Sequence, residues 1–291
     1  MLKISKISFP GLGIEEFEVD SVAFSIGDID IAWYALIITC GIIAAGLYTI
    51  WRANQVNVST DDIIDFLLFV VPTGIIGARL YYVLTTLDRY DSFLEVINIR
   101  NGGLAIYGGI LAGALAVFLV ARFKKIPFLT IADCCTPGII LAQSIGRWGN
   151  FMNGEAYGYQ TDAFIRMGLQ NSNTRFDFSV VEMVFVHPTF LYESLWNLVG
   201  FVLINLFYKH RKYDGQVFLM VFGWYGLGRM WIEGLRTDSL TVFGGAVRVS
   251  QLLAFLIFIA AAVLLTYFFI KKTEKPIFVQ PEKKKTNTKK K

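Results

Sequence analysis

Three stretches of 21 residues in this chain of 291 residues carry no charged side chain: Ile31–Trp51, Asn101–Ala121 and Ser250–Ile270. A helix of about 20 apolar residues is long enough to cross the hydrocarbon core of a bilayer. Soluble domains average about 25% charged residues, whereas this chain has 17% charged and 55% hydrophobic residues. We therefore expect an integral membrane protein. Nucleic-acid binding is not expected, because the basic residues form no folded basic face.

Four further apolar stretches carry one or two ionisable residues each, at about 63–84, 126–147, 189–208 and 216–233. With the three uncharged stretches they predict an all-α membrane protein of about seven transmembrane helices. We expect an external N-terminal segment over residues 1–30 and a seven-helix domain over residues 31–271. That domain includes an external loop region at 148–188. A basic, disordered cytoplasmic tail is expected over residues 272–291.

The distribution of Lys and Arg predicts the orientation, because cytoplasmic loops are enriched in these residues. The loops and tail on one side hold 16 of them, including the clusters at 122–125 and 209–212, and those on the other side hold 8. The N-terminus is therefore expected outside and the C-terminus in the cytoplasm. With this orientation, the unusual polar residues collect at the outer ends of the helices.

One such group lies in residues 146–155, which read Gly-Arg-Trp-Gly-Asn-Phe-Met-Asn-Gly-Glu. Its polar members are Arg147, Asn150, Asn153 and Glu155. Two glycines are expected to break the helix here, and irregular backbone at membrane depth must be buried in protein or line a wet cavity. A polar exit loop with an Arg that reaches out to the interface is the alternative.

A second group lies on the last outward-running helix. Arg229, Glu233 and Arg236 follow Tyr225 by 4, 8 and 11 residues, which places all four on one narrow face. Glu233 comes four residues after Arg229 and can hold its guanidinium. We expect an anion site, since planar guanidinium groups suit phosphate. A salt-bridged anchor at the interface is the alternative.

The inward-running helices begin with unusual residues too. Gly102 and Gly103 open one of them, and Tyr107 follows in its first turn; close helix packing and an interfacial aromatic are the ordinary explanations. His187 precedes Pro188 at the start of another, and we expect it to cap or position rather than to act as a base. The acidic stretch 61–65 follows Ser59, so helix capping accounts for it. No metal or cofactor is expected.

Four segments, at 102–109, 146–155, 187–193 and 225–238, resemble the prolipoprotein diacylglyceryl transferase family. The resemblance runs in order from about residue 20 to residue 270, and the segment 146–155 is highly specific. It implies a seven-helix enzyme of the bacterial cytoplasmic (inner) membrane with its active site toward the outer leaflet. Such an enzyme transfers the diacylglyceryl group of phosphatidylglycerol to the lipobox cysteine, beside the signal peptide of a prolipoprotein. The products are a thioether and glycerol phosphate.

The resemblance also implies roles for the residues of these segments. It places in the site Arg147, Asn150, Asn153, Glu155, Tyr225, Arg229 and Glu233, with His187 nearby. We expect Arg147 and Arg229 to bind the lipid phosphate and Glu233 to orient Arg229. The glycerol and the peptide would be held by Asn150, Asn153 and Tyr107, with Gly102 and Gly103 beside them.

Tyr107 is a departure from the family pattern, because many members have His at this position. A phenol with a pKa near 10 is a poor base at neutral pH, so we expect Tyr107 to position the substrate. The main alternative to an enzyme is a transporter with an anion gate formed by glycine-broken helices. The enzyme is favoured because the polar residues crowd one interface and no internal repeat is visible.

Overall fold

The computed structural model describes residues 4–90, 92–99, 102–171, 183–237, 241–242 and 247–281. Contacts divide the chain into two compact units. One comprises Met1–Leu47 with Cys135–Pro276, and the other Tyr48–Cys134 with Ile277–Lys291. The helices α1 (Trp33–Asn54) and α5 (Phe128–Met152) each begin in one unit and end in the other.

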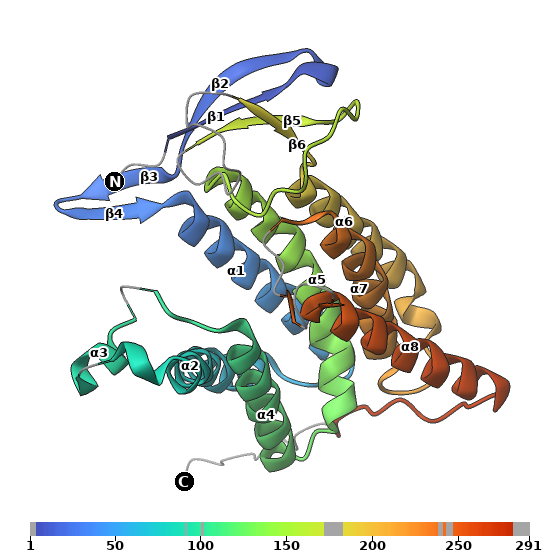
Figure 1. The fold of residues 1–291 in the computed structure, drawn as a ribbon. Helices are drawn as coiled ribbons and strands as arrows, with labels where there is room; N and C mark the ends of the chain where they lie inside the picture. Colours follow the sequence, from blue (N-terminus) through green and yellow to red (C-terminus); the bar gives the residue numbers. More distant parts are fainter. Residues whose placement is uncertain are drawn as a thin grey trace, which may run out of the picture. The chain divides into compact units, whose positions relative to one another are not determined.

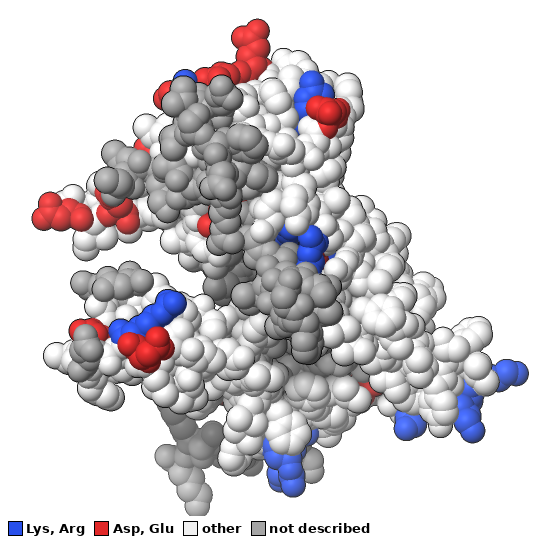
Figure 2. Space-filling model, viewed as in Figure 1, with Lys and Arg blue, Asp and Glu red and all other residues white. Residues whose placement is uncertain are grey.

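Seven helices of 19 residues or more occur in the described part of the chain, close to the predicted spans (Figure 1). Besides α1 and α5, they are α2 (Thr60–Thr85), α4 (Ile106–Lys124), α6 (Thr189–Phe207), α7 (Gln216–Leu235) and α8 (Val249–Ile270). Six of these described helices are long and apolar enough to cross a membrane, α7 being the exception. The predicted helical, multi-pass membrane fold is confirmed. Along α8 the visible surface is uncharged, and Lys and Arg gather at its C-terminal end (Figure 2).

A small antiparallel sheet in the first unit was not anticipated from the sequence. Its strand order is β2 (Ile14–Asp20), β1 (Ile4–Phe9), β5 (Met167–Gln170), β6 (Val184–Val186). A hairpin of β3 (Val22–Ile26) and β4 (Ile29–Ala32) leads into α1, and β7 (Thr241–Val242) pairs with β8 (Val247–Arg248) before α8. The segments 1–30 and 148–188 therefore contain strands as well as loops (Figure 1).

The sheet is attached to the ends of two helices by a hydrophobic core. Ile7, Leu169 and Val186 have no exposed surface, and they pack with Phe190 at the start of α6 and Phe151 at the end of α5. Burial of each such side chain stabilises the fold by about 1.5–3 kcal/mol. The sheet therefore fixes the ends of α5 and α6, from which several candidate site residues project.

A pair of tryptophans locks α6 against α7. The indole Nε1 of Trp196 donates to the carbonyl oxygen of Trp224 at 3.1 Å, and the Trp224 indole donates to the Trp196 carbonyl at 3.0 Å. The two rings stack with centroids 4.5 Å apart. Gly228 makes room, since a Cβ there would lie 2.1 Å from the Trp196 nitrogen. This contact sets the spacing of α6 and α7 next to the candidate site.

In the second unit, α2 packs closely on α4 through glycines. A Cβ at Gly77 would lie 2.7 Å from the Gly108 carbonyl oxygen, so larger residues do not fit. The uncharged stretch 101–121 predicted that α4 begins at residue 101. This prediction was wrong, because α4 begins at Ile106. Gly102 and Gly103 adopt left-handed conformations, with φ of +83° and +78°, and stand outside the helix. In the sequence, the short helix α3 (Phe93–Ile97) comes between α2 and α4.

The acidic stretch at the start of α2 is a capped helix end, as predicted, and it also forms ion pairs that were not predicted. The Ser59 hydroxyl accepts a hydrogen bond from the Asp62 backbone N–H at 3.2 Å. Lys124 of α4 binds Asp62 at 2.8 Å and Asp65 at 2.6 Å. The cap and the ion pairs account for Asp62 and Asp65.

The segment after α8 returns to the second unit. Ile277 and Phe278 pack against its hydrophobic core, and the Gln280 N–H donates to the Val56 carbonyl at 2.9 Å. The predicted disordered tail is thus in contact with the fold at its beginning. Residues 282–291, which carry most of its lysines, lie outside the described residues.

Candidate functional site

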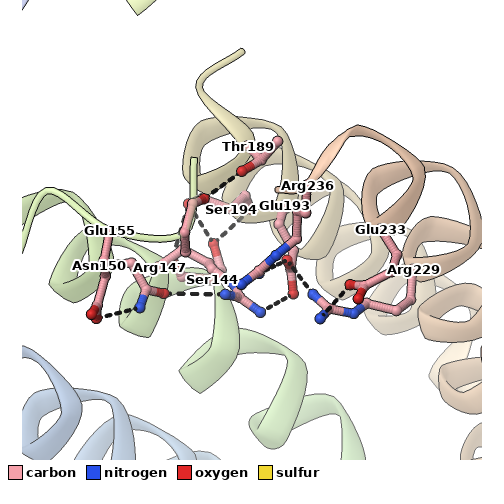
Figure 3. Close-up of polar contacts among 11 residues, drawn as sticks. Ser144, Arg147, Asn150, Glu155, Thr189, Glu193, Ser194, Arg229, Glu233 and Arg236 are labelled. Carbon is pink, nitrogen blue, oxygen red and sulfur yellow. Dashed lines mark hydrogen bonds and ion pairs between the residues drawn. The ribbon is translucent and has the colours of Figure 1, made fainter. Parts of the chain in front are cut away.

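Glu193, in the first turns of α6, is the centre of a buried cluster of charges (Figure 3). Its carboxylate binds the Arg147 guanidinium of α5 through Oε1, and Arg229 of α7 through Oε2 at 3.0 Å. Arg236, directly after α7, lies 3.9 Å from the same Oε2. The Glu193 side chain is 5% exposed, and a carboxylate buried to this degree must be paired. Glu193 therefore holds together guanidinium groups from two helices and a loop.

Arg229 bridges two buried carboxylates. Its Nη2 lies 2.6 Å from Oε2 of Glu233, four residues later on α7, so the ion pair expected from the spacing is present. Arg248 holds the backbone of Glu233 in place. It donates to the Glu233 backbone carbonyl at 2.6 Å and to the Tyr159 hydroxyl at 2.9 Å. With one carboxylate at each amino group, the Arg229 guanidinium has a defined plane.

A second chain of hydrogen bonds runs from Arg147 along the end of α5. Arg147 Nη1 donates to Asn150 Oδ1 at 3.1 Å, and Asn150 Nδ2 donates to Glu155 Oε1 at 3.0 Å. Asn153 Nδ2 donates to the same carboxylate oxygen at 3.1 Å. The four polar residues of the segment 146–155 are therefore in one network.

The expected helix break within this segment was wrong, since α5 continues to Met152. Gly146 and Gly149 instead allow α1 to come close. A Cβ on Gly149 would lie 2.8 Å from the Tyr34 ring. The chain turns only at Gly154, with φ of +59°, which brings Glu155 back over the helix end. Tyr34 is close enough to Glu155 and Arg147 to interact with both electrostatically.

The buried cluster has an excess of positive charge. Three guanidinium groups, from Arg147, Arg229 and Arg236, meet two carboxylates, from Glu193 and Glu233, which leaves one positive charge. The Arg147 side chain is 21% exposed and that of Arg229 is 15% exposed, so both keep an accessible side. Fixed guanidinium groups with spare charge are suited to bind a phosphate.

His187 lies just before α6 and is held by its neighbours. Its Nδ1 is 3.2 Å from the Tyr192 hydroxyl, and its backbone pairs with Gly158 and Tyr159 at 2.9 and 3.0 Å. Burial lowers the pKa of the His187 imidazole below its ordinary value. Among the described contacts, its ring meets none of the clustered arginines. Tyr225 is half-buried, one turn before Arg229.

The remaining expected site residues belong to the second unit. Tyr107 is half-buried in the first turn of α4, and the carbonyl oxygens of Gly102 and Gly103 both accept hydrogen bonds from Arg79 at 2.9 Å. That these three residues share a substrate site with Arg147 stays a prediction.

The residue at the centre of the cluster was not among the predicted site residues. Glu193 was recognised as an ionisable group in an apolar span, which is itself a sign of function, but it was not placed in the site. Arg236 was placed on the same helix face as Arg229 and Glu233, but it was not predicted as a site residue. Arg248 and Tyr34 gave no comparable signal, because their contacts come from distant parts of the sequence.

The sequence is similar to those of known proteins. A family model described as prolipoprotein diacylglyceryl transferase matches residues 21–267. Several relatives bear the name phosphatidylglycerol–prolipoprotein diacylglyceryl transferase. One from Enterococcus faecalis is 45% identical over 250 residues, 85% of this chain and 90% of its own. One from Lactobacillus delbrueckii subsp. bulgaricus is 41% identical over 257 residues, 87% and 92% respectively. One from Clostridioides difficile is 42% identical over 237 residues, 81% and 90% respectively.

Proposed function

Because the chain belongs to the prolipoprotein diacylglyceryl transferase family, we propose that it transfers the diacylglyceryl group of phosphatidylglycerol to a cysteine thiol of prolipoproteins. The cysteine sulfur forms a bond to the carbon of the diacylglycerol unit that carries the phosphate. The carbon–oxygen bond breaks, and its electron pair leaves on the phosphate oxygen of glycerol phosphate. The thiol proton is released to water, and the products are a thioether and glycerol phosphate.

This chemistry requires alignment and charge compensation more than strong acid catalysis. The leaving group is a phosphate ester, a stable anion. A free thiol has a pKa of about 8.5, and cationic surroundings increase its thiolate fraction. The enzyme must therefore align sulfur, carbon and leaving oxygen, and stabilise the charge that develops on the phosphate.

One observation carries the assignment of the site: Glu193 holds Arg147 and Arg229 by the two oxygens of a single carboxylate. The two guanidinium groups then have a fixed separation, and their free sides can bind one phosphate. Glu233 keeps Arg229 in its plane. The amides of Asn150 and Asn153, held by Glu155, would orient the glycerol headgroup.

The remaining parts of the proposal rest on the sequence pattern. Tyr107, Gly102 and Gly103 position the lipid or the peptide, and the peptide substrate presents its lipobox. The N-terminus and the active site face the outer leaflet of a bacterial cytoplasmic membrane, supported by the excess of Lys and Arg in the other set of loops. No nucleic acid takes part.

The test is a reaction of the purified full chain in phosphatidylglycerol vesicles with a lipobox peptide, analysed by mass spectrometry. We expect a diacylglyceryl adduct on the peptide. The adduct should be absent with a Cys→Ser peptide and with Arg147→Ala enzyme, and present with Arg166→Ala. Among the described residues, Arg166 contacts the loop carbonyls of Asp162 and Ala163 and the Phe185 ring. No adduct from folded wild-type enzyme would refute the function; an adduct from Arg147→Ala would refute the site.

A further inference from the structure

A polar cavity of about 260 Å³ lies within the second unit, in the connection between α2 and α4. Its lining includes Arg79, Arg89, Tyr82, Tyr90, Glu95 and Asn98. The volume is slightly below the roughly 300 Å³ at which pockets for small ligands begin, so an occupant must be small or must enter only in part. Two cations, one carboxylate, one amide and two phenols give the cavity a mixed polar character.

Arg79 is fixed in the wall by neutral acceptors. It donates to the carbonyl oxygens of Glu95 and Val96 at 2.7 Å and to those of Gly102 and Gly103 at 2.9 Å. Four carbonyls orient the guanidinium but do not neutralise its charge, and one of its five N–H groups is left over. Within the described ranges, no carboxylate forms an ion pair with Arg79.

Arg89 adds a second positive charge to the same lining. Its Nη1 lies 3.3 Å from the Tyr82 hydroxyl, and no ion pair joins it to a carboxylate in the described part of the chain. The two guanidinium groups outnumber the single carboxylate of this lining, that of Glu95, and the excess of positive charge favours an anion such as phosphate. The Glu95 carboxylate would repel a bare phosphate but can accept hydrogen bonds from hydroxyl groups. The cavity therefore suits a phosphate that carries hydroxyls.

Exposed apolar side chains stand beside this cavity. On α3, which carries Glu95, Phe93 is 76% exposed, Leu94 73% and Ile97 55%. In a membrane protein such side chains favour the acyl region of the bilayer. A ligand with a polyol phosphate at one end and acyl chains at the other matches both surfaces.

We propose that this cavity binds the phosphoglycerol headgroup of a phosphatidylglycerol molecule. Arg79 and Arg89 bind the phosphate, the headgroup hydroxyls donate to Glu95 and to the Asn98 side chain, and the acyl chains lie along α3. The choice of this lipid rests on the proposed function. The lining also includes Gly102 and Gly103, which we propose to position the lipid or the peptide, but it includes no residue of the Glu193 cluster. Loss of one site can therefore be separated from loss of the other.

The test measures lipid binding, not catalysis. The full chain in detergent is titrated with phosphatidylglycerol, and the retained lipids are counted by native mass spectrometry. Arg89→Gln should weaken the binding of one lipid about tenfold, since a charge-assisted contact is lost. Arg89 is exposed, so the fold should survive, and Arg166→Gln, a loop arginine outside the cavity, should bind as wild type does. Equal binding by Arg89→Gln and wild type would overturn the proposal.

Two competitor arms define the ligand. Phosphatidylcholine has no headgroup hydroxyls and is zwitterionic, so equal binding of this lipid would also overturn the proposal. Soluble glycerol phosphate should displace the lipid only at much higher concentration; displacement at equal concentration would reject the lipid as the source of the phosphate. A wild-type protein that shows Arg89-dependent lipid binding but transfers nothing would count against the proposed function alone.

Discussion

Replacement of Glu193 by Gln tests the organisation of the site most directly, because it removes one charge and keeps the shape. Gln offers one carbonyl oxygen where Glu193 offers two charged oxygens to Arg147 and Arg229. One of these guanidinium groups loses its acceptor, and Arg236 loses a negative charge 3.9 Å away. Three positive charges then share one buried carboxylate, that of Glu233.

The expected loss of stability follows from the burial of these groups. Removal of one partner from a buried ion pair costs about 3–5 kcal/mol. Arg147 and Arg229 are 21% and 15% exposed and can be partly solvated, so we expect a cost at the lower end of that range. At about 2–4 °C per kcal/mol for a chain of this size, Tm falls by roughly 6–12 °C. A shift of about 1 Å in a guanidinium group should slow transfer about 100-fold.

The assay combines thermal unfolding of the purified variant with its rate of lipobox-peptide modification. Glu274→Gln is the matched control, because Glu274 forms an exposed ion pair with Lys212, so the same chemical change there should leave Tm and rate near their wild-type values. If Glu193→Gln kept the wild-type rate and Tm, Glu193 would not organise the cluster, and the assignment of the phosphate site would fail.

Further outcomes follow from the same contacts. Arg229→Lys should slow peptide modification at least 100-fold, because an ammonium group cannot contact Glu193 and Glu233 in one plane as a guanidinium group does. A wild-type rate in this variant would exclude the proposed role of Arg229 in binding the phosphate. Arg248→Gln removes the donor to the Glu233 carbonyl and should lower kcat about tenfold while KM for the peptide stays constant, with partial recovery in Arg248→Lys. A change in KM alone would argue against positioning. Burial lowers the pKa of His187, so protonation favours the unfolded state. The Tm of wild type should therefore be constant above about pH 6.5 and fall below it, whereas a His187→Gln variant that falls equally would refute this cause.

Local pattern was sufficient for the helices and for one ion pair. Uncharged stretches of membrane-spanning length predicted α1 and α8 within a few residues, because the bilayer fixes the length of an apolar helix. The Arg229–Glu233 pair followed from four-residue spacing, since side chains at that spacing lie on one helix face. Even local pattern failed at the start of α4, where Gly102 and Gly103 are apolar in composition but left-handed in conformation.

Tertiary structure alone decided which distant residues meet. Ile7 pairs with Leu169 in the sheet, a contact that no local periodicity encodes, because either strand alone has only a short apolar pattern. Glu193 was visible in the sequence as a costly charge in an apolar span, yet its partners come from α5, α7 and the segment after α7. A buried charge of this kind must be paired, and the sequence alone indicates that a partner is needed. Only the packing of the helices decides which guanidinium groups pair with Glu193.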